Sequence, residues 1–334
     1  MHEPPVLLRR MRGEGSYNSQ ALLDALRSLS HGERVADDLQ GPYRRFYAAD
    51  QFSIPVQCSM VCLDVTVDGR SEQVVVHQFL PDRIEAWALL TPGWTDHVGL
   101  FGYAIEFFLR QGVAVIAYDQ IGHGLSSGQR ATIADFDHYV QALDVVHRWA
   151  RETHGFAWCH WIGQSMGGSV TLEYLQQYPQ EQIGEVVLFA PLVRPYMWWL
   201  NRWVFAVAKL TIEARPLLIK PNTEGAEFLQ LRLNDPLQPH DMRVQWVQAM
   251  VNWFRRFERY PVASLAPKVL QGYADRTVSW RHSVQVLGRR YPGTTWHMMP
   301  KAQHHLVNEA PELRESMWQW LAARCVWTAP VTPE

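Results

Sequence analysis

The chain has 334 residues, a formal net charge of −2 at pH 7, and 47% hydrophobic against 19% charged residues. This is the balance of a globular protein with a sizeable core, and it excludes an intrinsically disordered chain. The near-neutral charge gives no electrostatic reason to expect a nucleic acid as a partner.

The four cysteines predict neither a disulfide framework nor a zinc site. Cys58 and Cys62 are close together, but no second Cys or His pair lies at zinc-binding spacing. Cys159 lies in an apolar segment and is expected to be buried. Reduced thiols fit a cytosolic protein best.

Residues 1–57 show little regular pattern and are interpreted as an N-terminal extension, with one helix predicted over residues 20–29. Residues 1–20 contain an early acid and two prolines but no apolar segment of signal-peptide length. No window reaches the ~18 uninterrupted apolar residues of a transmembrane helix. We therefore expect a cytoplasmic protein. Peripheral contact with the inner face of the membrane stays open, as does the oligomeric state.

Beyond residue 57, segments typical of strands alternate with segments typical of helices. Residues 113–118 are rich in β-branched residues, as in a strand buried on both faces. Such alternation predicts an α/β protein with a mainly parallel sheet covered by helices on both faces. Eight strands are expected, at residues 61–67, 73–80, 85–91, 113–118, 157–162, 185–189, 268–270 and 294–299.

The alternation stops between residues 192 and 262, where the pattern is helical, rich in Trp and Phe, and without a clear strand. We interpret residues 192–262 as an insertion into a core domain built from residues 58–191 and 263–325.

The sharpest motif is a GxSxG sequence centred on Ser165, between a predicted strand and a predicted helix. This context is the one required by a nucleophile elbow, a tight turn that lifts a serine above the sheet. Gly163 and Gly167 are needed because side chains there would collide with neighbouring backbone. The helix N-terminus favours developing negative charge at the serine. A glycine-rich turn that happens to contain serine is the alternative.

A serine nucleophile needs a base, and the base needs an acid that orients it. Asp275 and His304 follow Ser165 in the chain order Ser, Asp, His, and each lies just past a predicted strand. The carboxyl ends of strands are where open α/β sheets bind ligands. His305 leaves the base ambiguous. His297 and Asp235 are weaker rivals.

Two backbone N–H groups are needed to stabilise the oxyanion. We expect one from Met166, directly after the nucleophile, and the other from Trp94 in the loop after the third strand. An ordinary turn is the alternative for that loop.

With these motifs, the chain resembles the monoglyceride lipase and lysophospholipase branch of the α/β hydrolases, which includes bacterial lysophospholipase L2-type proteins. The matching pieces are Gly93-Trp94, the D-x-x-G-H-G-x-S sequence from Asp119 to Ser126, the GQSMGG elbow, and the Asp275 and His304 segments. The resemblance implies the α/β-hydrolase fold, His304 as the base and a structural Asp119. It covers roughly residues 60–323. Pro92 stands where the family usually has histidine, which excludes a side-chain role there.

In this family the insertion forms a cap over the active site. Here an apolar acyl pocket with a membrane-facing lip is one interpretation, and packing of the cap against the core is the other. The candidate pocket residues are Trp198, Trp199, Trp203, Trp253 and Phe254.

The expected reaction is carboxylic ester hydrolysis through an acyl-enzyme, without a metal or organic cofactor. The expected substrate is a single-chain lipid ester, either monoacylglycerol or lysophospholipid. Two alternatives stay open. One is another acyl hydrolase of this fold, such as a small-ester esterase, a thioesterase or a peptidase. The other is a non-catalytic binding protein.

Overall fold

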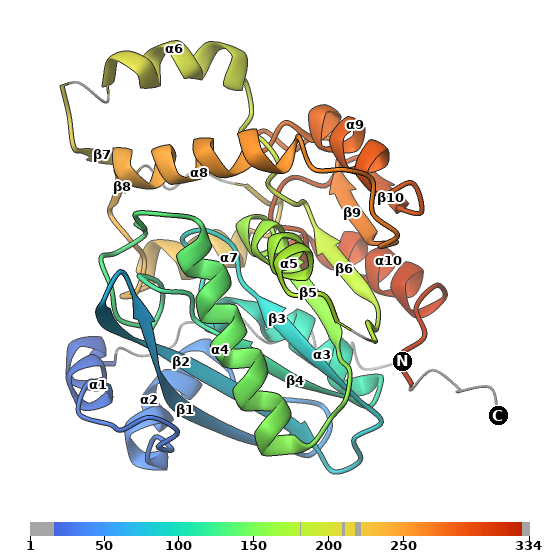
Figure 1. Ribbon diagram of the computed structural model, residues 1–334. Helices are drawn as coiled ribbons and strands as arrows, with labels where there is room; N and C mark the ends of the chain where they lie inside the picture. Colours follow the sequence, from blue (N-terminus) through green and yellow to red (C-terminus); the bar gives the residue numbers. More distant parts are fainter. Residues whose placement is uncertain (1–16, 181, 209–210, 218–221, 329–334) are drawn as a thin grey trace.

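An eight-stranded sheet forms the centre of the computed structural model, which describes residues 17–180, 182–208, 211–217 and 222–328 (Figure 1). The strand order is β1-β2-β4-β3-β5-β6-β9-β10. The first two pairs, β1–β2 and β2–β4, are antiparallel, and all later pairs are parallel. The predicted α/β fold with a mainly parallel eight-stranded sheet is confirmed. The strands are β1 (Val56–Val67), β2 (Arg70–Pro81), β3 (Ala86–Thr91), β4 (Val113–Tyr118), β5 (His160–Gln164), β6 (Val186–Phe189), β9 (Lys268–Gly272) and β10 (Thr295–Met299).

Helices cover both faces of this sheet, and each face has its own apolar cluster. One cluster joins the sheet to α1 (Ser19–Leu26), α2 (Asp37–Tyr47), α3 (Gly102–Arg110) and α10 (Pro311–Ala322). The other joins it to α4 (Asp137–His154), α5 (Met166–Gln177), α8 (Val244–Phe257) and α9 (Trp280–Arg290).

Helix α4 illustrates how the sequence specifies such an element. Its buried apolar side chains recur at Tyr139, Leu143, Val146 and Ala150, a spacing that places them on one helical face. The helix ends at Gly155, whose φ of 71° lies in the left-handed region that glycine adopts without strain. All of β4, by contrast, is buried, as expected for a strand with helices on both faces.

The N-terminal extension is more regular than its sequence suggests, because it contains α2 as well as the predicted helix near residue 20. Helix α2 includes Gly41 and Pro42, both poor helix formers, which explains why its sequence does not predict it. Tyr43, Phe46 and Tyr47 are buried on one face of this helix. Packing of that face overrides the low intrinsic propensity. Residues 1–16 of the extension lie outside the described residues.

We call residues 192–262 the cap segment. It contains α6 (Trp198–Ala208), α7 (Ala226–Asn234) and α8, and Figure 1 shows α6 beyond α8 on the side away from the sheet. The expectation of a segment without strands is wrong, because β7 (Ala214–Pro216) and β8 (Asp241–Arg243) pair antiparallel. Three-residue strands are too short to give a periodic signal. Residues 209–210 and 218–221 lie outside the described residues.

Candidate active site

The GxSxG turn has the geometry that its sequence requires. Ser165 has φ 52° and ψ −117°, a strained conformation for a residue other than glycine, and it lies between β5 and α5. A Cβ on Gly163 would lie 2.5 Å from Gly168 Cα, and one on Gly167 would lie 2.0 Å from the Thr91 carbonyl oxygen. Real Cβ atoms do not approach so closely. Both glycines are therefore needed to bring β5, α5 and β3 together.

Ser165, His304 and Asp275 come together at the carboxyl ends of the strands. His304 Nε2 lies 2.9 Å from Ser165 Oγ, and His304 Nδ1 lies 2.8 Å from Asp275 Oδ2. All three side chains are buried, and Ser165 is only 7% exposed. The loop after β10 is held in place because the N–H groups of His304 and His305 both donate to the Asn222 carbonyl of the cap segment.

The environment of Asp275 favours its ionised form. Burial alone would raise the pKa of the Asp275 carboxyl, but the neighbouring His304 imidazole and the N–H groups of Val278 and Thr277 outweigh it. The pKa is therefore held below its usual value. The two N–H groups donate to Oδ1 at 3.0 and 2.7 Å, and this leaves Oδ2 to accept from His304. This arrangement orients the imidazole with its Nε2 toward Ser165.

The loop after β3 lies directly against the nucleophile. A Cβ on Gly93 would lie 3.3 Å from Ser165 Cβ, so a side chain at this position would crowd the nucleophile. The N–H of Trp94 donates to no other residue among those described. The N–H of Met166 belongs to the first turn of α5, where helical N–H groups have no intrahelical acceptor. Both predicted oxyanion donors are thus free to donate, one directly after Ser165 and the other directly after Gly93.

The two adjacent histidines have different carboxylate partners: His304 contacts Asp275, and His305 contacts Asp96. His305 Nε2 lies 3.2 Å from Asp96 Oδ2, and His305 Nδ1 accepts from Asn308 Nδ2 at 3.1 Å. Burial would raise the pKa of the Asp96 carboxyl, but His305 and Arg232 hold it below its usual value. A Cβ on Gly93 would lie 2.6 Å from Asp96 Oδ2, so this pair lies beside the candidate site without contacting Ser165 Oγ. No sequence motif singles out Asp96, although it lies three residues after Gly93.

Asp235 and His297, the weaker candidates for the catalytic acid and base, have other partners. Asp235 lies 3.0 Å from His97 Nε2, and His297 stacks on the Trp320 ring at 4.9 Å. The two carboxylate oxygens of Asp119 accept from the N–H groups of Val98 and Leu125, each at 2.8 Å. Asp119 therefore fixes the loops behind the site.

The five candidate pocket residues are not brought together. Trp199 and Trp203 are 67% and 65% exposed on α6. Trp253 is buried, stacks on Phe136 at 4.5 Å, and donates from Nε1 to Glu173 at 2.9 Å. Phe254 is buried against Trp198, with ring centroids 5.3 Å apart. Three of the five predicted pocket residues thus pack inside the molecule, and the other two face outward.

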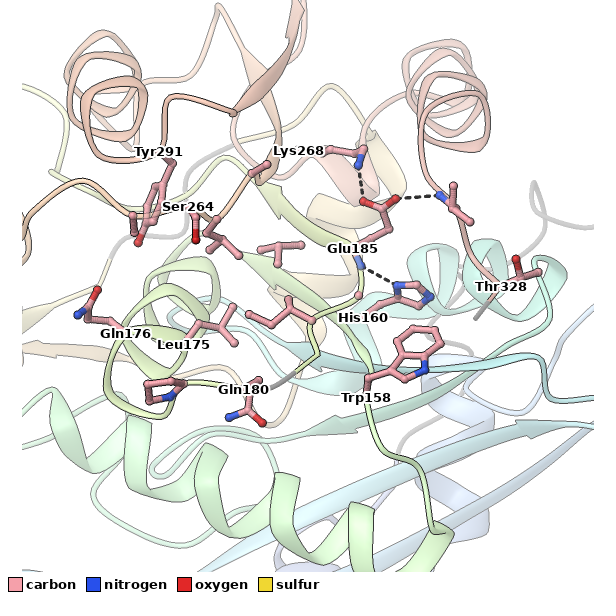
Figure 2. Close-up of a pocket in the computed structure, with 18 residues that line it drawn as sticks. Trp158, His160, Leu175, Gln176, Gln180, Glu185, Ser264, Lys268, Tyr291 and Thr328 are labelled. Atoms are coloured by element: carbon pink, nitrogen blue, oxygen red, sulfur yellow. Dashed lines mark hydrogen bonds and ion pairs between the residues drawn. The ribbon is translucent and has the colours of Figure 1, made fainter. Parts of the chain in front are cut away.

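A cavity of about 640 Å³ lies at the opposite end of the strands from Ser165 (Figure 2). Its lining includes His160 and Lys268, the first residues of β5 and β9, whereas Ser165 follows the last residue of β5. The Lys268 ammonium and the Glu185 carboxylate already pair with each other there. This cavity is not part of the candidate active site. Among the described residues, no group of three or more His, Cys, Asp or Glu side chains could hold a metal ion.

A strained serine on a strand–turn–helix, paired with a histidine and an aspartate at neighbouring strand ends, is the arrangement of an α/β-hydrolase. A sequence model of the serine aminopeptidase S33 hydrolases matches residues 82–311. The chain belongs to this family.

Relatives and solved structures agree with that placement. The chain is 26% identical to monoglyceride lipase from Rattus norvegicus over 247 residues, which covers 70% of this chain and 80% of the relative. It is 25% identical to monoacylglycerol lipase from Mycolicibacterium smegmatis, covering 70% and 87%. The structure of a soluble variant of monoglyceride lipase from Saccharomyces cerevisiae superposes with a TM-score of 0.67 at 16% identity, covering 80% and 95%. These findings support an ester hydrolase that resembles the monoglyceride lipases.

Proposed function

We propose that the chain is a serine hydrolase that cleaves carboxylic esters of single-chain lipids through an acyl-enzyme. The observation that carries the proposal is the continuous set of hydrogen bonds from Ser165 Oγ to His304 and on to Asp275. A hydroxyl becomes a competent nucleophile only with a base in hydrogen-bond reach, and a base is most effective when a third group orients it.

In this mechanism His304 Nε2 accepts the Ser165 proton as Oγ attacks the ester carbonyl carbon. Asp275 holds the Nδ1 proton and stabilises the imidazolium that forms. The N–H groups of Trp94 and Met166 donate to the oxyanion of the tetrahedral intermediate. The imidazolium then protonates the departing alcohol. Water, deprotonated by His304, attacks the acyl-enzyme, and the imidazolium returns the proton to Ser165 Oγ as the carboxylic acid leaves.

The proposed substrate class rests on the relatives and on the cap segment. Relatives that match 70% of this chain are named as monoglyceride or monoacylglycerol lipases. Helix α6 presents Trp199, Leu200, Trp203 and Val204 to the outside, together with the exposed Arg202. Trp and Arg side chains suit the interface between lipid tails and head groups. We therefore propose that α6 makes peripheral contact with the lipid surface that holds the substrate. Within the described ranges, no helix is both long and apolar enough to cross a bilayer.

A fluorophosphonate probe tests the nucleophile directly. The native chain is expected to label, and Ser165→Ala and His304→Ala are expected to abolish labelling, because the probe reports an activated serine. The same three proteins are then compared on 1-monooleoylglycerol, lysophosphatidylcholine, p-nitrophenyl butyrate, an acyl thioester and an amino-acid nitroanilide.

Hydrolysis of the two dispersed lipids would support the proposed substrate class, and their ratio would tell monoacylglycerol from lysophospholipid. Activity on the soluble ester alone would overturn the lipid assignment. Preference for the nitroanilide would favour a peptidase, the activity named in the description of the matching family. No labelling of the native chain with or without detergent would favour a binding protein.

A further inference from the structure

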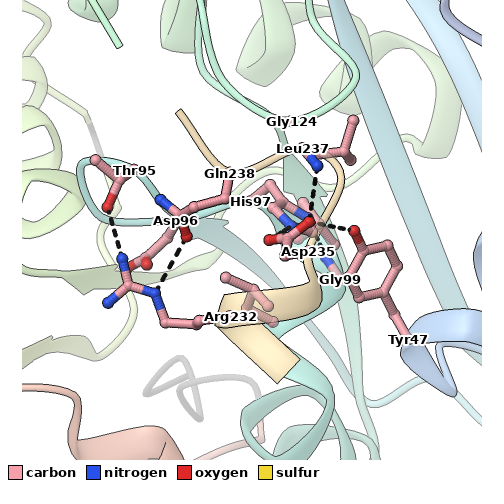
Figure 3. A network of polar contacts seen from close by, with 12 residues as sticks. Tyr47, Thr95, Asp96, His97, Gly99, Gly124, Arg232, Asp235, Leu237 and Gln238 are labelled. Carbon is pink, nitrogen blue, oxygen red and sulfur yellow. Dashed lines mark hydrogen bonds and ion pairs between the residues drawn. The ribbon is translucent and has the colours of Figure 1, made fainter. Parts of the chain in front are cut away.

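A buried network of hydrogen bonds connects the N-terminal extension, the cap segment and the loop that carries Trp94 (Figure 3). We call residues 93–97 the oxyanion loop. We propose that Tyr47 and Asp235 are positioning residues for this loop, so that the extension is a working part of the active site. This inference rests on the proposed function.

The oxyanion loop is strained and needs support. Thr95 has φ 67°, in the left-handed region that β-branched residues rarely adopt. Such a conformation persists only where the surroundings determine it. Inside the loop, one hydrogen bond joins the Asp96 N–H to the Gly93 carbonyl at 3.2 Å. Further support must come from other elements.

Helix α7 supplies two contacts to the loop. Arg232 donates to Thr95 Oγ1 at 3.2 Å and to Gln238 Oε1 at 3.2 Å. Three residues later, Asp235 Oδ2 lies 3.0 Å from His97 Nε2. His97 Nδ1 accepts from the Gly99 N–H at 3.2 Å, and its Nε2 therefore carries the proton donated to Asp235. The end of α7 thus holds the oxyanion loop at both Thr95 and His97.

Asp235 is fixed in turn by the N-terminal extension. The Tyr47 hydroxyl, at the end of α2, donates to Asp235 Oδ1 at 2.6 Å, and the Leu237 N–H donates to the same oxygen at 2.9 Å. Tyr47 also packs edge-on against the His97 ring at 4.8 Å. Asp235, His97 and Tyr47 are all at most 5% exposed. A buried carboxylate that loses one of three donors must shift toward the remaining two or stay under-paired.

These contacts extend the site beyond the part of the chain that the family match covers. The match begins at residue 82, and Tyr47 lies before it. The two residues that meet at the Tyr47–Asp235 bond are 188 positions apart in sequence. The extension is therefore tied to the rest of the molecule at the point where cap segment and oxyanion loop meet.

The test compares the full-length native chain with Tyr47→Phe and Asp235→Asn on a soluble ester. We expect kcat to fall about tenfold in each variant while KM stays within about twofold, since the oxyanion donor acts in the transition state. The inhibition constant of a trifluoromethyl ketone, which forms a tetrahedral oxyanion, should rise by the same factor. Titration with the fluorophosphonate at saturation should give the same number of active sites as in the native chain.

Tyr260→Phe is the matched control. The Tyr260 hydroxyl donates to Glu173 at 2.8 Å, a comparable bond to a carboxylate, and the other side-chain partners of Glu173 among the described residues are Gln177, Trp253 and Arg256, none of them in the oxyanion loop. Its kcat should equal that of the native chain. Native kcat in Tyr47→Phe and Asp235→Asn, or a loss explained by fewer titrated sites, would overturn the inference and leave the proposed function intact. If Tyr47→Phe does not fold, Asp235→Asn decides. A native chain that neither labels nor hydrolyses the ester would overturn both proposals.

Discussion

The carboxyl ends of the strands carry the proposed catalytic residues, and the cap segment carries the proposed lipid contact. The two regions are built differently. At the strand ends, each side chain is fixed by hydrogen bonds to particular partners, as in the Ser165–His304–Asp275 set. In the cap segment, aromatic residues of similar chemistry divide between a buried helix and an exposed one. Trp253 on α8 is 1% exposed, whereas Trp203 on α6 is 65% exposed. The chemistry at the strand ends therefore depends on which residue occupies each position. In the cap segment, the role of an aromatic residue depends on whether it is buried or exposed.

The histidine doublet gives the largest expected effect. His304→Ala should reduce kcat/KM at least ~10³-fold, because it removes the base in contact with Ser165 Oγ. His305→Ala should reduce it less than about tenfold, because His305 contacts Asp96 and Asn308 instead. Steady-state kinetics on a soluble ester would measure both. Equal losses would contradict the idea that neighbouring residues at the strand ends have separate roles.

Two tryptophans of the cap segment, Trp253 and Trp203, should differ in their contribution to stability. Trp253→Ala should lower the free energy of unfolding by about 3–5 kcal/mol, because it removes a buried ring stacked on Phe136 and leaves Glu173 without its Nε1 donor. Trp203→Ala should change it by less than about 0.5 kcal/mol. Urea denaturation followed by circular dichroism would compare the two variants.

Trp203 should instead matter for activity on lipid. Trp203→Ala should lower hydrolysis of a dispersed lipid relative to a soluble ester, because the exposed ring of α6 is proposed to meet the lipid surface. A parallel loss on both substrates would mean that α6 affects the site itself rather than its access to lipid.

These contrasts explain how much could be predicted from the sequence. The elbow at Ser165 is local, since its glycines, its serine and the flanking strand and helix lie within a few positions. Asp275 and His304 could be found because both follow strands that bring them to one end of the sheet. The Tyr47–Asp235–His97 contacts could not be found, because they join segments whose separation in sequence carries no periodic signal. For the cap segment, composition alone did not separate the buried Trp253 from the exposed Trp203.

The smallest expected effect on kcat concerns the contact between the cap segment and the oxyanion loop. Trp246 of α8 stacks on Trp94 of the oxyanion loop, with ring centroids 4.1 Å apart and an interplanar angle of 16°. An aromatic pair contributes about 0.5–1.5 kcal/mol beyond its buried area. If the whole of that stacking supports the oxyanion donor, Trp246→Leu should lower kcat by a factor of roughly 2–13.

Trp320→Leu serves as the control, because Trp320 stacks on His297 at 4.9 Å on a different part of the fold. Its kcat should match that of the native chain even if its stability falls. An unchanged kcat in Trp246→Leu would mean that the α8 aromatics act through packing alone. A reduced kcat would mean that the Trp246 ring supports the loop in addition to Arg232 and Asp235. The oxyanion loop, which lies at the strand ends, would then depend on the cap segment for its position.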